Sequence, residues 1–272
     1  MASDSPSLTP LEGWHVLHLY YRLRRGVLHG FSAQQRAAAR EEWLKLLDAS
    51  GPGAPPRLQT FAVMGQKADF GLLLMGPHPL QLDRMQQQLQ AGVLGAALEP
   101  AYSFVSLTEV SEYVPTPEQY AQRLREEGQE PQSEAFAIKV KTYAAREEKM
   151  RAQRLYPEIP PWPCVCFYPM SKKREVGENW YSLPFEERMR LMTGHGKTGQ
   201  TFAGKVVQLI TTSTGLDDWE WGVTLWARNP QYLKEIVYTM RFDEASARYA
   251  LFGSFYVGYV QTPAELLQHL QV

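Results

Sequence analysis

The chain has 272 residues, long enough for a substantial core, and its 44% hydrophobic and 21% charged residues are ordinary for a globular protein. Lys and Arg number 28 and Asp and Glu 29, so the net charge is −1 and nothing favours nucleic acid as a partner. The N-terminus lacks the basic and apolar regions of a secretory signal, and no apolar run is long enough to span a bilayer.

The first half of the chain, residues 1–112, predicts the element order strand, helix, strand, strand, helix, strand. Ser32 is a plausible N-cap of the first helix, and Gly65 marks a hairpin between the second and third strands. The expected elements are the strand 13–23, the helix 31–50, the strands 58–64 and 68–76, the helix 78–90 and the strand 101–110.

A charged, proline-flanked stretch, residues 113–162, follows the first unit. Its composition predicts a linker with two solvated helical pieces instead of a third core. Residues 163–272 then repeat the order of the first unit. The expected elements are the strand 163–170, a helix from Pro184, strands 205–213 and 218–226 around Gly215, the helix 229–242, the strand 252–260 and a terminal helix capped by Thr262.

The two cysteines, Cys164 and Cys166, lie in the first strand of the second unit. Neighbours on one strand face do not readily close a disulfide, and structural zinc sites use a C-x2-C spacing. We therefore expect two small buried side chains in a reducing, cytoplasmic compartment.

An internal repeat relates the two units at a constant offset of 151 residues. The stretch DFGLLLMGPHPLQL from Asp69 matches EWGVTLWARNPQYL from Glu220, and the same offset sets Phe104 against Phe255. Each unit has the order of the split βαβ, or ferredoxin-like, arrangement. Two such sheets can pack face to face or close on each other, with the helices outside.

The first helix of the second unit departs from its counterpart because it contains several glycines in SLPFEERMRLMTGHGKTGQTFAG. Glycine is costly inside a helix, so we expect the helix to end here or its backbone to be closely approached. His195 lies between two of these glycines. It suits an axial ligand of heme iron, or else a histidine that caps the helix C-terminus.

Three residues of FYPMSKKR share one face of the strand that precedes this helix: Tyr168, Met170 and Lys172. Tyr168 alone could be a core tyrosine and Lys172 a lysine that extends to water. Gln208 lies among apolar strand residues and requires either a structural hydrogen bond or a ligand. The repeat offset sets Tyr168, Lys172, His195 and Gln208 against Leu17, Tyr21, Leu44 and Arg57. The first unit therefore has no equivalents, and we expect the second unit to carry the site.

The motifs YPMSKKR, NWYSLPFEERMRLMTGHGKTG, KVVQLITTSTGLDDWEWGVTLW and DEASARYALFGSFYVG closely resemble the chlorite dismutase family. Within it they resemble the iron-coproporphyrin decarboxylases, which make heme b. The similarity is dense over about residues 150–260 and thinner over the first hundred. It implies an α+β fold in which two ferredoxin-like (βαββαβ) repeats form a dimeric α+β barrel within one chain, and a homopentamer of such chains.

Carried over position by position, the resemblance assigns roles to the site residues. His195 matches the iron ligand, Tyr168 the tyrosine that forms the reactive radical, and Lys172 the lysine beside the second reacting propionate. The other matches are three propionate contacts, the distal glutamine and a residue lining the pocket: Arg154, Ser246, Tyr113, Gln208 and Met170.

The resemblance implies iron coproporphyrin III as substrate and redox centre, hydrogen peroxide as oxidant and heme b as product. Gln200 replaces the arginine usual in the family after HGKTG, so a contact made there is missing or replaced. Gln208 stands where chlorite-degrading members carry arginine, and without that cation a hypochlorite-like anion lacks its main stabiliser. The alternatives are a heme-binding carrier or sensor without catalysis, and a heme peroxidase or chlorite-degrading enzyme of the same fold.

Overall fold

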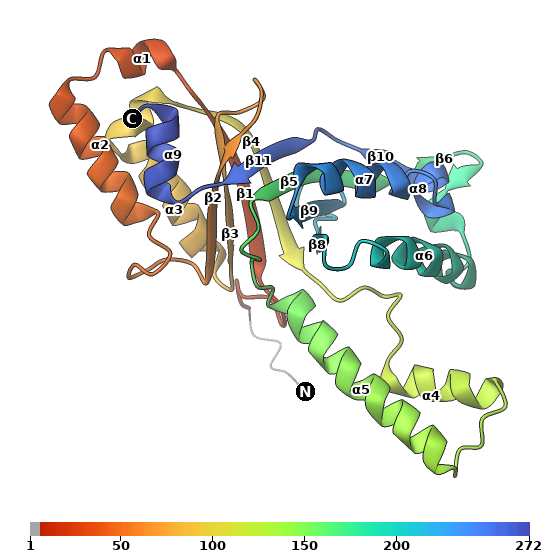
Figure 1. The fold of residues 1–272 in the computed structure, drawn as a ribbon. Coiled ribbons are helices and arrows are strands. Elements are labelled where there is room, and N and C mark those ends of the chain that lie inside the picture. Colours follow the sequence, from red (N-terminus) through yellow and green to blue (C-terminus); the bar gives the residue numbers. More distant parts are fainter. Residues whose placement is uncertain (1–5) are drawn as a thin grey trace.

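The main β-sheet closes on itself, and helices cover its outer faces (Figure 1). The computed structural model describes residues 6–272; residues 1–5, the start of the segment predicted to lack a secretory signal, lie outside them. The elements are β1 (His15–Leu23), α1 (Arg25–His29), α2 (Ala33–Leu46), β2 (Arg57–Val63), β3 (Phe70–Gly76), α3 (Pro79–Ala91), η1 (Val93–Ala97), β4 (Leu98–Thr108), α4 (Pro117–Glu126), α5 (Glu134–Leu155), β5 (Cys164–Lys172), β6 (Arg174–Glu175), β7 (Glu178–Asn179), η2 (Trp180–Ser182), α6 (Phe185–Gln200), β8 (Val206–Thr212), β9 (Trp221–Ala227), α7 (Pro230–Met240), α8 (Glu244–Tyr249), β10 (Ala250–Phe252), β11 (Tyr256–Val260) and α9 (Pro263–Leu270).

Strand β5 closes the barrel. The strands of the main sheet lie in the order β10-β5-β11-β2-β3-β1-β4-β8-β9. Because β5 also pairs with β9, the strands from β5 to β9 in this order form a closed ring. All the pairings are antiparallel. The interior holds one apolar cluster drawn from both units, for example Tyr20 and Phe61 from the first with Phe167 and Trp226 from the second. The predicted α+β class, with two ferredoxin-like repeats joined in a barrel, is confirmed.

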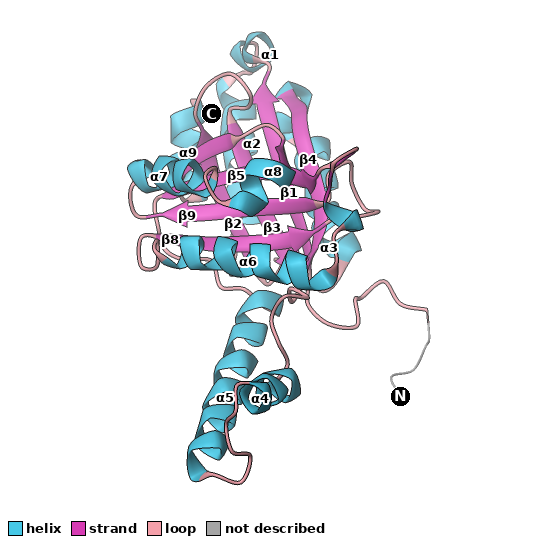
Figure 2. Cartoon of the chain, turned by 90° about the vertical axis from the view of Figure 1, so that its right-hand side faces the viewer, coloured by secondary structure: helices cyan, strands magenta, loops and turns pink. Residues whose placement is uncertain are grey.

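Helices α2, α3 and α9 cover the outer face of the first unit (Figures 1 and 2). The predicted N-cap Ser32 is confirmed, since its side chain accepts a hydrogen bond from the backbone of Gln35. Helix α9 belongs to the C-terminal end of the chain, yet Leu266, Leu267 and Leu270 are buried in the core of the first unit. The last helix thus crosses back over the N-terminal half of the barrel.

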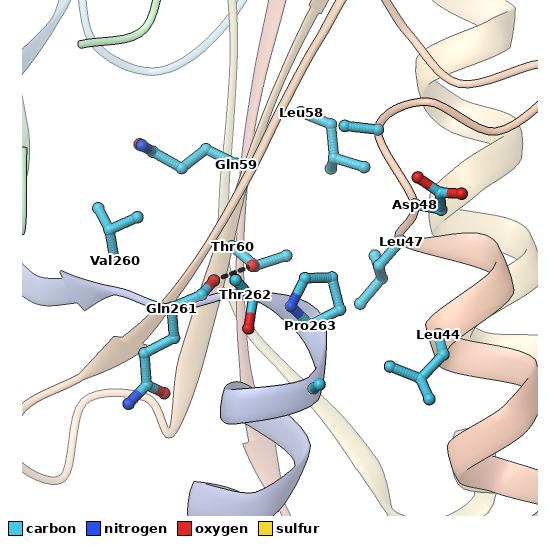
Figure 3. A pocket seen from close by; sticks show the side chains of 12 residues that line it. Leu44, Leu47, Asp48, Leu58, Gln59, Thr60, Val260, Gln261, Thr262 and Pro263 are labelled. Carbon is cyan, nitrogen blue, oxygen red and sulfur yellow. Dashed lines mark hydrogen bonds between the residues drawn. The ribbon is translucent and has the colours of Figure 1, made fainter. Parts of the chain in front are cut away.

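A pocket of about 450 Å³ remains where α9 enters this layer (Figure 3). It lies between the end of α2, the start of β2 and the N-terminus of α9, and Leu44, Leu58 and Pro263 are among its lining residues. The hydroxyl of Thr60 donates a 2.5 Å hydrogen bond to the backbone carbonyl of Gln261 across its wall. Helix α9 therefore occupies most, but not all, of the space between α2 and β2.

The strand pairings correct the repeat at three of the site positions. Tyr168 pairs with Val223, whose counterpart Leu72 pairs with Leu19, so Leu19 and not Leu17 corresponds to Tyr168. Met170 pairs with Trp221, whose counterpart Phe70 pairs with Tyr21, so Tyr21 corresponds to Met170 and not to Lys172.

The third position lies on β8. Gln208 pairs with Leu225, and Leu74, the counterpart of Leu225 at the offset of 151, pairs with Leu58. Leu58, not Arg57, is therefore the structural counterpart of Gln208. The second unit has one residue fewer before β8 and regains it in the β8–β9 hairpin, and a one-residue shift moves a strand's side chains to the other face.

A one-residue shift in the opposite direction separates β4 from β11, where Tyr256 and not Phe255 corresponds to Phe104. Phe104 lies inside the barrel, whereas Phe255 packs outside it against Tyr168, so the predicted match of Phe104 with Phe255 is wrong in register. For the glycine-rich helix, the expectation that it ends at its glycines is wrong. Helix α6 does not end at His195 but continues to Gln200.

Helices α4 and α5, predicted as pieces of the linker, form a hairpin that stands away from the barrel (Figures 1 and 2). A small cluster of their own, with Leu124 and Phe136, joins the two helices, and Tyr120 stacks on Tyr143. Cys164 and Cys166 are buried free thiols, as expected. No helix within residues 6–272 is both long and apolar enough to cross a membrane.

His18 inside the barrel gives a test of the fold. Burial lowers the pKa of His18 to about 3, and its Nε2 lies 2.8 Å from the hydroxyl of Thr224. The unfolded chain binds a proton at this imidazole below its ordinary pKa of 6.5 while the folded chain does not, so acid stabilises the unfolded state between those values. We expect His18→Asn to remove about 1 kcal/mol per pH unit from the dependence of unfolding free energy on pH between 6 and 5.

Urea unfolding at pH 7, 6 and 5 measures this dependence for both proteins. His29→Asn, at an exposed histidine of α1, is the matched control and should keep the pH dependence of the original chain. An equal pH dependence in His18→Asn and the original chain would contradict the assignment.

Candidate functional site

The outer face of the second unit carries the predicted site residues of β5. Tyr168 lies beside Val223 of β9, which in turn pairs with Ile210 of β8. Met170 occupies the next row, beside Trp221, and Lys172 follows on the same face. Tyr168 and Lys172 are each only 9% exposed, so this face is covered.

The cover comes from several segments, since Phe252 and Phe255 pack on Tyr168 and Trp180 lies over the ammonium of Lys172. Helix α7 contacts β8 and β9, whereas α6 packs chiefly against α7 and α8 and not on the strands. A Cβ atom at Gly199 would lie 3.2 Å from Nε2 of Gln208 and 3.1 Å from Cε of Met240, so here α6 comes close to the sheet. The glycine at position 199 of α6 is therefore explained by a close approach to the helix backbone. His195 precedes Gly199 by one turn and therefore projects from the same face of α6.

The imidazole of His195 is held from one side. Its Nδ1 lies 3.1 Å from Oδ2 of Asp243 and 3.4 Å from the hydroxyl of Ser246. A carboxylate only accepts, so Nδ1 donates and Nε2 keeps a lone pair for a metal ion. Burial by itself raises the pKa of Asp243, but the hydrogen bonds and charge of His195 and the hydrogen bonds of Ser246 outweigh it, so the net pKa is lowered.

Asp243 is held in turn by the start of α8. It is the N-cap of that helix, and its Oδ1 accepts a 3.1 Å hydrogen bond from the backbone of Ser246. Our sequence reasoning missed Asp243, although an aspartate directly before a helical EASARY is a recognisable N-cap signal. What could not be foreseen is that the cap would lie against an imidazole 48 residues earlier.

Lys172 ends the row on β5 in a mixed environment. Its ammonium lies 4.1 Å from the ring centroid of Trp180, and its backbone N–H donates a 2.7 Å hydrogen bond to buried Glu220. Burial lowers the pKa of Lys172 to about 8, while the charges of Asp243 and Glu220 act in the opposite direction. Near neutral pH this lysine therefore gains or loses a proton much more readily than an exposed one.

Tyr168 has a different local environment. Its ring stacks on Phe255 at 4.3 Å and meets Phe252 edge to face at 5.8 Å. Burial raises the pKa of Tyr168, with a smaller contribution from Cys166, against the opposing charge of Arg241. The phenol therefore keeps its proton throughout the neutral range.

Tyr113 and Arg154 take different positions relative to these residues. Tyr113 packs with Trp180 at 6.4 Å and stacks on Phe185 at 5.9 Å, so it joins the site at the N-terminal end of α6. Arg154 is exposed in the last turn of α5, and no ion pair involving it is seen within residues 6–272. The structure thus places four of the predicted residues on one sheet face: Tyr168, Met170, Lys172 and Gln208. His195 and Ser246 lie together, Tyr113 lies at the N-terminal end of α6, and Arg154 lies at the end of α5.

Partly buried apolar side chains gather on this sheet face and on the helices that lie over it. Met170 and Ile210 of the sheet and Met240 at the end of α7 face the helix layer, yet all three are only partly buried. Met192, on the His195 face of α6, is also partly buried. Thioether and aliphatic walls with one imidazole above them fit a metallated macrocycle, because such a ligand presents an apolar face and one axial coordination position.

A further helix covers the outer sheet face of the first unit. Helix α2 is the counterpart of α6. Like α6, it packs chiefly against other helices and not on the strands, and α9 packs between α2 and β2. In the second unit α6 packs chiefly against α7 and α8, and α7 in turn contacts β8 and β9. The helix that packs against both α2 and β2 in the first unit, α9, comes from the C-terminal end of the chain.

Comparison with known proteins agrees with this fold. The family model described as chlorite dismutase matches residues 36–261. A solved structure of a heme-binding protein from Thermus thermophilus is 35% identical, with a TM-score of 0.78, over 98% of this chain and 99% of that one.

Two more distant structures share the fold at 15% identity. A putative chlorite dismutase named TA0507 matches with a TM-score of 0.66 over 95% of this chain and 99% of its own. A variant of the chlorite dismutase from Candidatus Nitrospira defluvii matches with a TM-score of 0.71 over 95% of this chain and 96% of its own. All of these matches extend over both units.

The lowered pKa of Lys172 can be tested directly. Competitive labelling of amines, followed by mass spectrometry of the Lys172 peptide, should give a pH midpoint of about 8. Glu220→Gln keeps a hydrogen-bond acceptor for the backbone of Lys172 but removes a charge that favours the ammonium, so the midpoint should fall below that of the original chain. Asp218→Asn, at an exposed carboxylate of the same loop, should leave it unchanged. A midpoint near the ordinary 10.5 would show that Lys172 is solvated.

Proposed function

The chain belongs to the chlorite dismutase family, and we propose that it is a coproheme decarboxylase within that family. The reaction is the hydrogen-peroxide-dependent oxidative decarboxylation of two propionates of iron coproporphyrin III to vinyl groups, which gives heme b. The observation that carries the proposal is the position of Tyr168 and Lys172. Both lie on the outer sheet face of the second unit, the face from which Gln208 approaches α6 one turn from His195.

The proposed site for the macrocycle is the space between α6 and the outer face of β5, β8 and β9, within residues 163–272. His195 would hold the iron through Nε2, because Asp243 takes the proton on Nδ1. Met170 and Ile210 would contact one face of the ring. When bound, the iron supplies the centre at which peroxide is reduced.

Tyr168 and Lys172 would act on the propionates. Each propionate that becomes a vinyl group loses one CO2, two electrons and one proton, and one peroxide takes up the two electrons. Tyr168 keeps its phenolic proton at neutral pH, so it can give up an electron and a proton and then take a hydrogen atom from the β-carbon of a propionate. Lys172 would pair with the carboxylate and exchange protons, which suits a lysine with a pKa of about 8.

Other groups would orient the carboxylates. Ser246 lies beside the imidazole and Tyr113 at the N-terminal end of α6, so each would contact a different propionate. Arg154 would have to approach from the end of α5. Gln208 faces α6 with a neutral amide, and the lack of a cation there disfavours chlorite breakdown.

A heme-binding carrier or sensor is the second candidate, because the 35% identical structure is named only as a heme-binding protein. That function needs His195 and the apolar walls but gives Tyr168 and Lys172 no task. Peroxide added to the complex with iron coproporphyrin separates the two, since a carrier yields no monovinyl or divinyl product. We further propose a cytoplasmic homopentamer, from the family resemblance and the two free buried thiols.

The first prediction concerns Tyr168. Tyr168→Phe should bind iron coproporphyrin III with the affinity of the original chain, because only a hydroxyl is lost. On addition of peroxide it should yield no vinyl product by mass spectrometry. Tyr238→Phe, at a tyrosine of α7 that is 63% exposed, is the matched control and should keep full conversion. Normal conversion by Tyr168→Phe would remove this tyrosine from the mechanism.

The second prediction concerns the iron ligand. His195→Ala should shift the Soret band of bound iron coproporphyrin and weaken its binding. Asp243→Asn keeps the ligand but alters its partner, so a loss of about tenfold in affinity is expected. His269→Ala, at an exposed histidine of α9, should change neither quantity. An unchanged Soret band in His195→Ala would show that another residue is axial.

A further inference from the structure

One face of α6 carries a cation that the proposed function has not used. Arg188, Met192, His195 and Gly199 follow one another at spacings of four, three and four residues, so they form a stripe along the helix. The Gly199 end of this stripe meets Gln208 on the sheet. Arg188 therefore projects from α6 on the side that faces the proposed porphyrin.

The guanidinium of Arg188 lacks hydrogen-bond acceptors in the part of the chain that the structure describes. Its side chain is only 19% exposed, and its Nε–H is buried without a hydrogen-bond partner within residues 6–272. The nearest carboxylate oxygen, Oε2 of Glu112, lies 3.9 Å from Nη2, beyond hydrogen-bond distance. A buried charged donor without an acceptor is rare in folded proteins and indicates a missing partner. The missing partner must be an acceptor, because arginine has no acceptor of its own.

The other arginine of this part of α6 is different. Arg190 is exposed, donates two hydrogen bonds to the carboxylate of Glu187, and is paired with Glu244 as well. The two arginines lie two residues apart and therefore on different faces of the helix. The unpaired donor is thus confined to the face that carries His195.

The distance from His195 suits the edge of a porphyrin. Arg188 and His195 are seven residues apart, which places them about 10 Å apart along the helix axis. Because a macrocycle held by an axial imidazole lies across the end of that side chain, its edge runs along the helix. A propionate at that edge reaches the same distance from the iron as Arg188.

The neighbours of Arg188 fit a carboxylate. Arg188 lies over the ring of Phe185 at 5.7 Å, and Phe185 stacks on Tyr113, which the sequence predicts as a propionate contact. Burial raises the pKa of Tyr113, so its hydroxyl stays a donor at neutral pH. Glu112 is the competing anion, but its side chain is 57% exposed and can move into water.

We infer that Arg188 is a substrate-binding residue that, together with Tyr113, holds one carboxylate of the porphyrin at the N-terminal end of α6. This inference rests on the proposed function, since it assumes a porphyrin with carboxylate arms in the space above β5. Arginine can donate two parallel hydrogen bonds to a carboxylate, a geometry that lysine does not reproduce. Arg188 thereby fixes which edge of the ring meets Lys172 and Tyr168.

Binding titrations of the porphyrin-free protein test this role without turnover. Iron coproporphyrin III and its tetramethyl ester, which has the same ring without charges, are titrated and followed at the Soret band. Arg188→Gln should weaken binding of the acid by about tenfold or more, as expected for loss of a charge-assisted pair, and leave binding of the ester unchanged. Arg188→Lys should recover part of the loss. Arg190→Gln, the control on the other face, should match the original chain with both ligands.

Each outcome decides the inference. An equal loss for the acid and the ester, or no loss with Arg188→Gln, overturns the role of Arg188 and leaves the proposed function standing. If the original chain fails to bind iron coproporphyrin at all, the proposed function fails and the role of Arg188 with it. Circular dichroism of Arg188→Gln checks that α6 is retained, and Arg188→Lys supplies a second, charge-conserving variant.

Discussion

The closure of the antiparallel sheet is the constraint on which the site depends. Strand β5 is hydrogen-bonded on both edges, so its backbone is fixed and its side chains must alternate between the barrel interior and the outer face. Phe167 is thereby committed to the interior, and Tyr168 and Lys172 to the outside. A phenol and an ammonium on the outside of a barrel stay in water unless a helix layer covers them. Here Phe252 and Phe255 cover Tyr168, Trp180 covers Lys172, and helices α6, α7 and α8 pack together over the second unit.

The two units cover their outer sheet faces with different segments. In both units a long helix, α2 or α6, packs chiefly against other helices and not on the strands. The apolar outer face of the sheet must therefore be covered by other groups. The first unit covers it with Leu266, Leu267 and Leu270 of α9, so the C-terminal end of the chain stabilises the N-terminal core. The second unit has no segment left to do the same. A ligand that enters there buries apolar surface that folding has left partly exposed, and this surface contributes to its affinity.

Much of this arrangement could be predicted from the sequence because strand and helix periods are local properties. The order of elements, the cap at Ser32 and the shared face of Tyr168 and Lys172 follow from such periods. The match of Arg57 with Gln208 failed because a constant offset cannot register a one-residue change in loop length, which reverses a strand's faces.

Two residues that act at the site were missed for a different reason. Asp243 and Arg188 are ordinary in sequence, as a helix cap and a helical arginine. Their importance comes from what they face. Asp243 meets an imidazole 48 residues away, and the Nε of Arg188 meets no acceptor within residues 6–272. The expected end of α6 near His195 was wrong for a related reason, because Gly199 marks a close approach to Gln208 and not an end of the helix. Contacts between distant segments are set by tertiary packing, which local patterns do not encode.

Burial has opposite effects on the two proposed catalytic groups, and together these effects suit the chemistry. Burial in two different surroundings raises the pKa of Tyr168 and lowers that of Lys172 to about 8, so both groups favour their neutral forms more than in water. A propionate placed beside Lys172 adds a negative charge and raises the pKa of the lysine, which then takes up a proton and pairs with the carboxylate. Loss of that carboxylate as CO2 removes the charge, and the lysine again releases its proton more easily. Under the proposed function, Lys172 would thereby be reset by the departure of the group it holds, and Tyr168 would carry its phenolic proton at the start of each turnover.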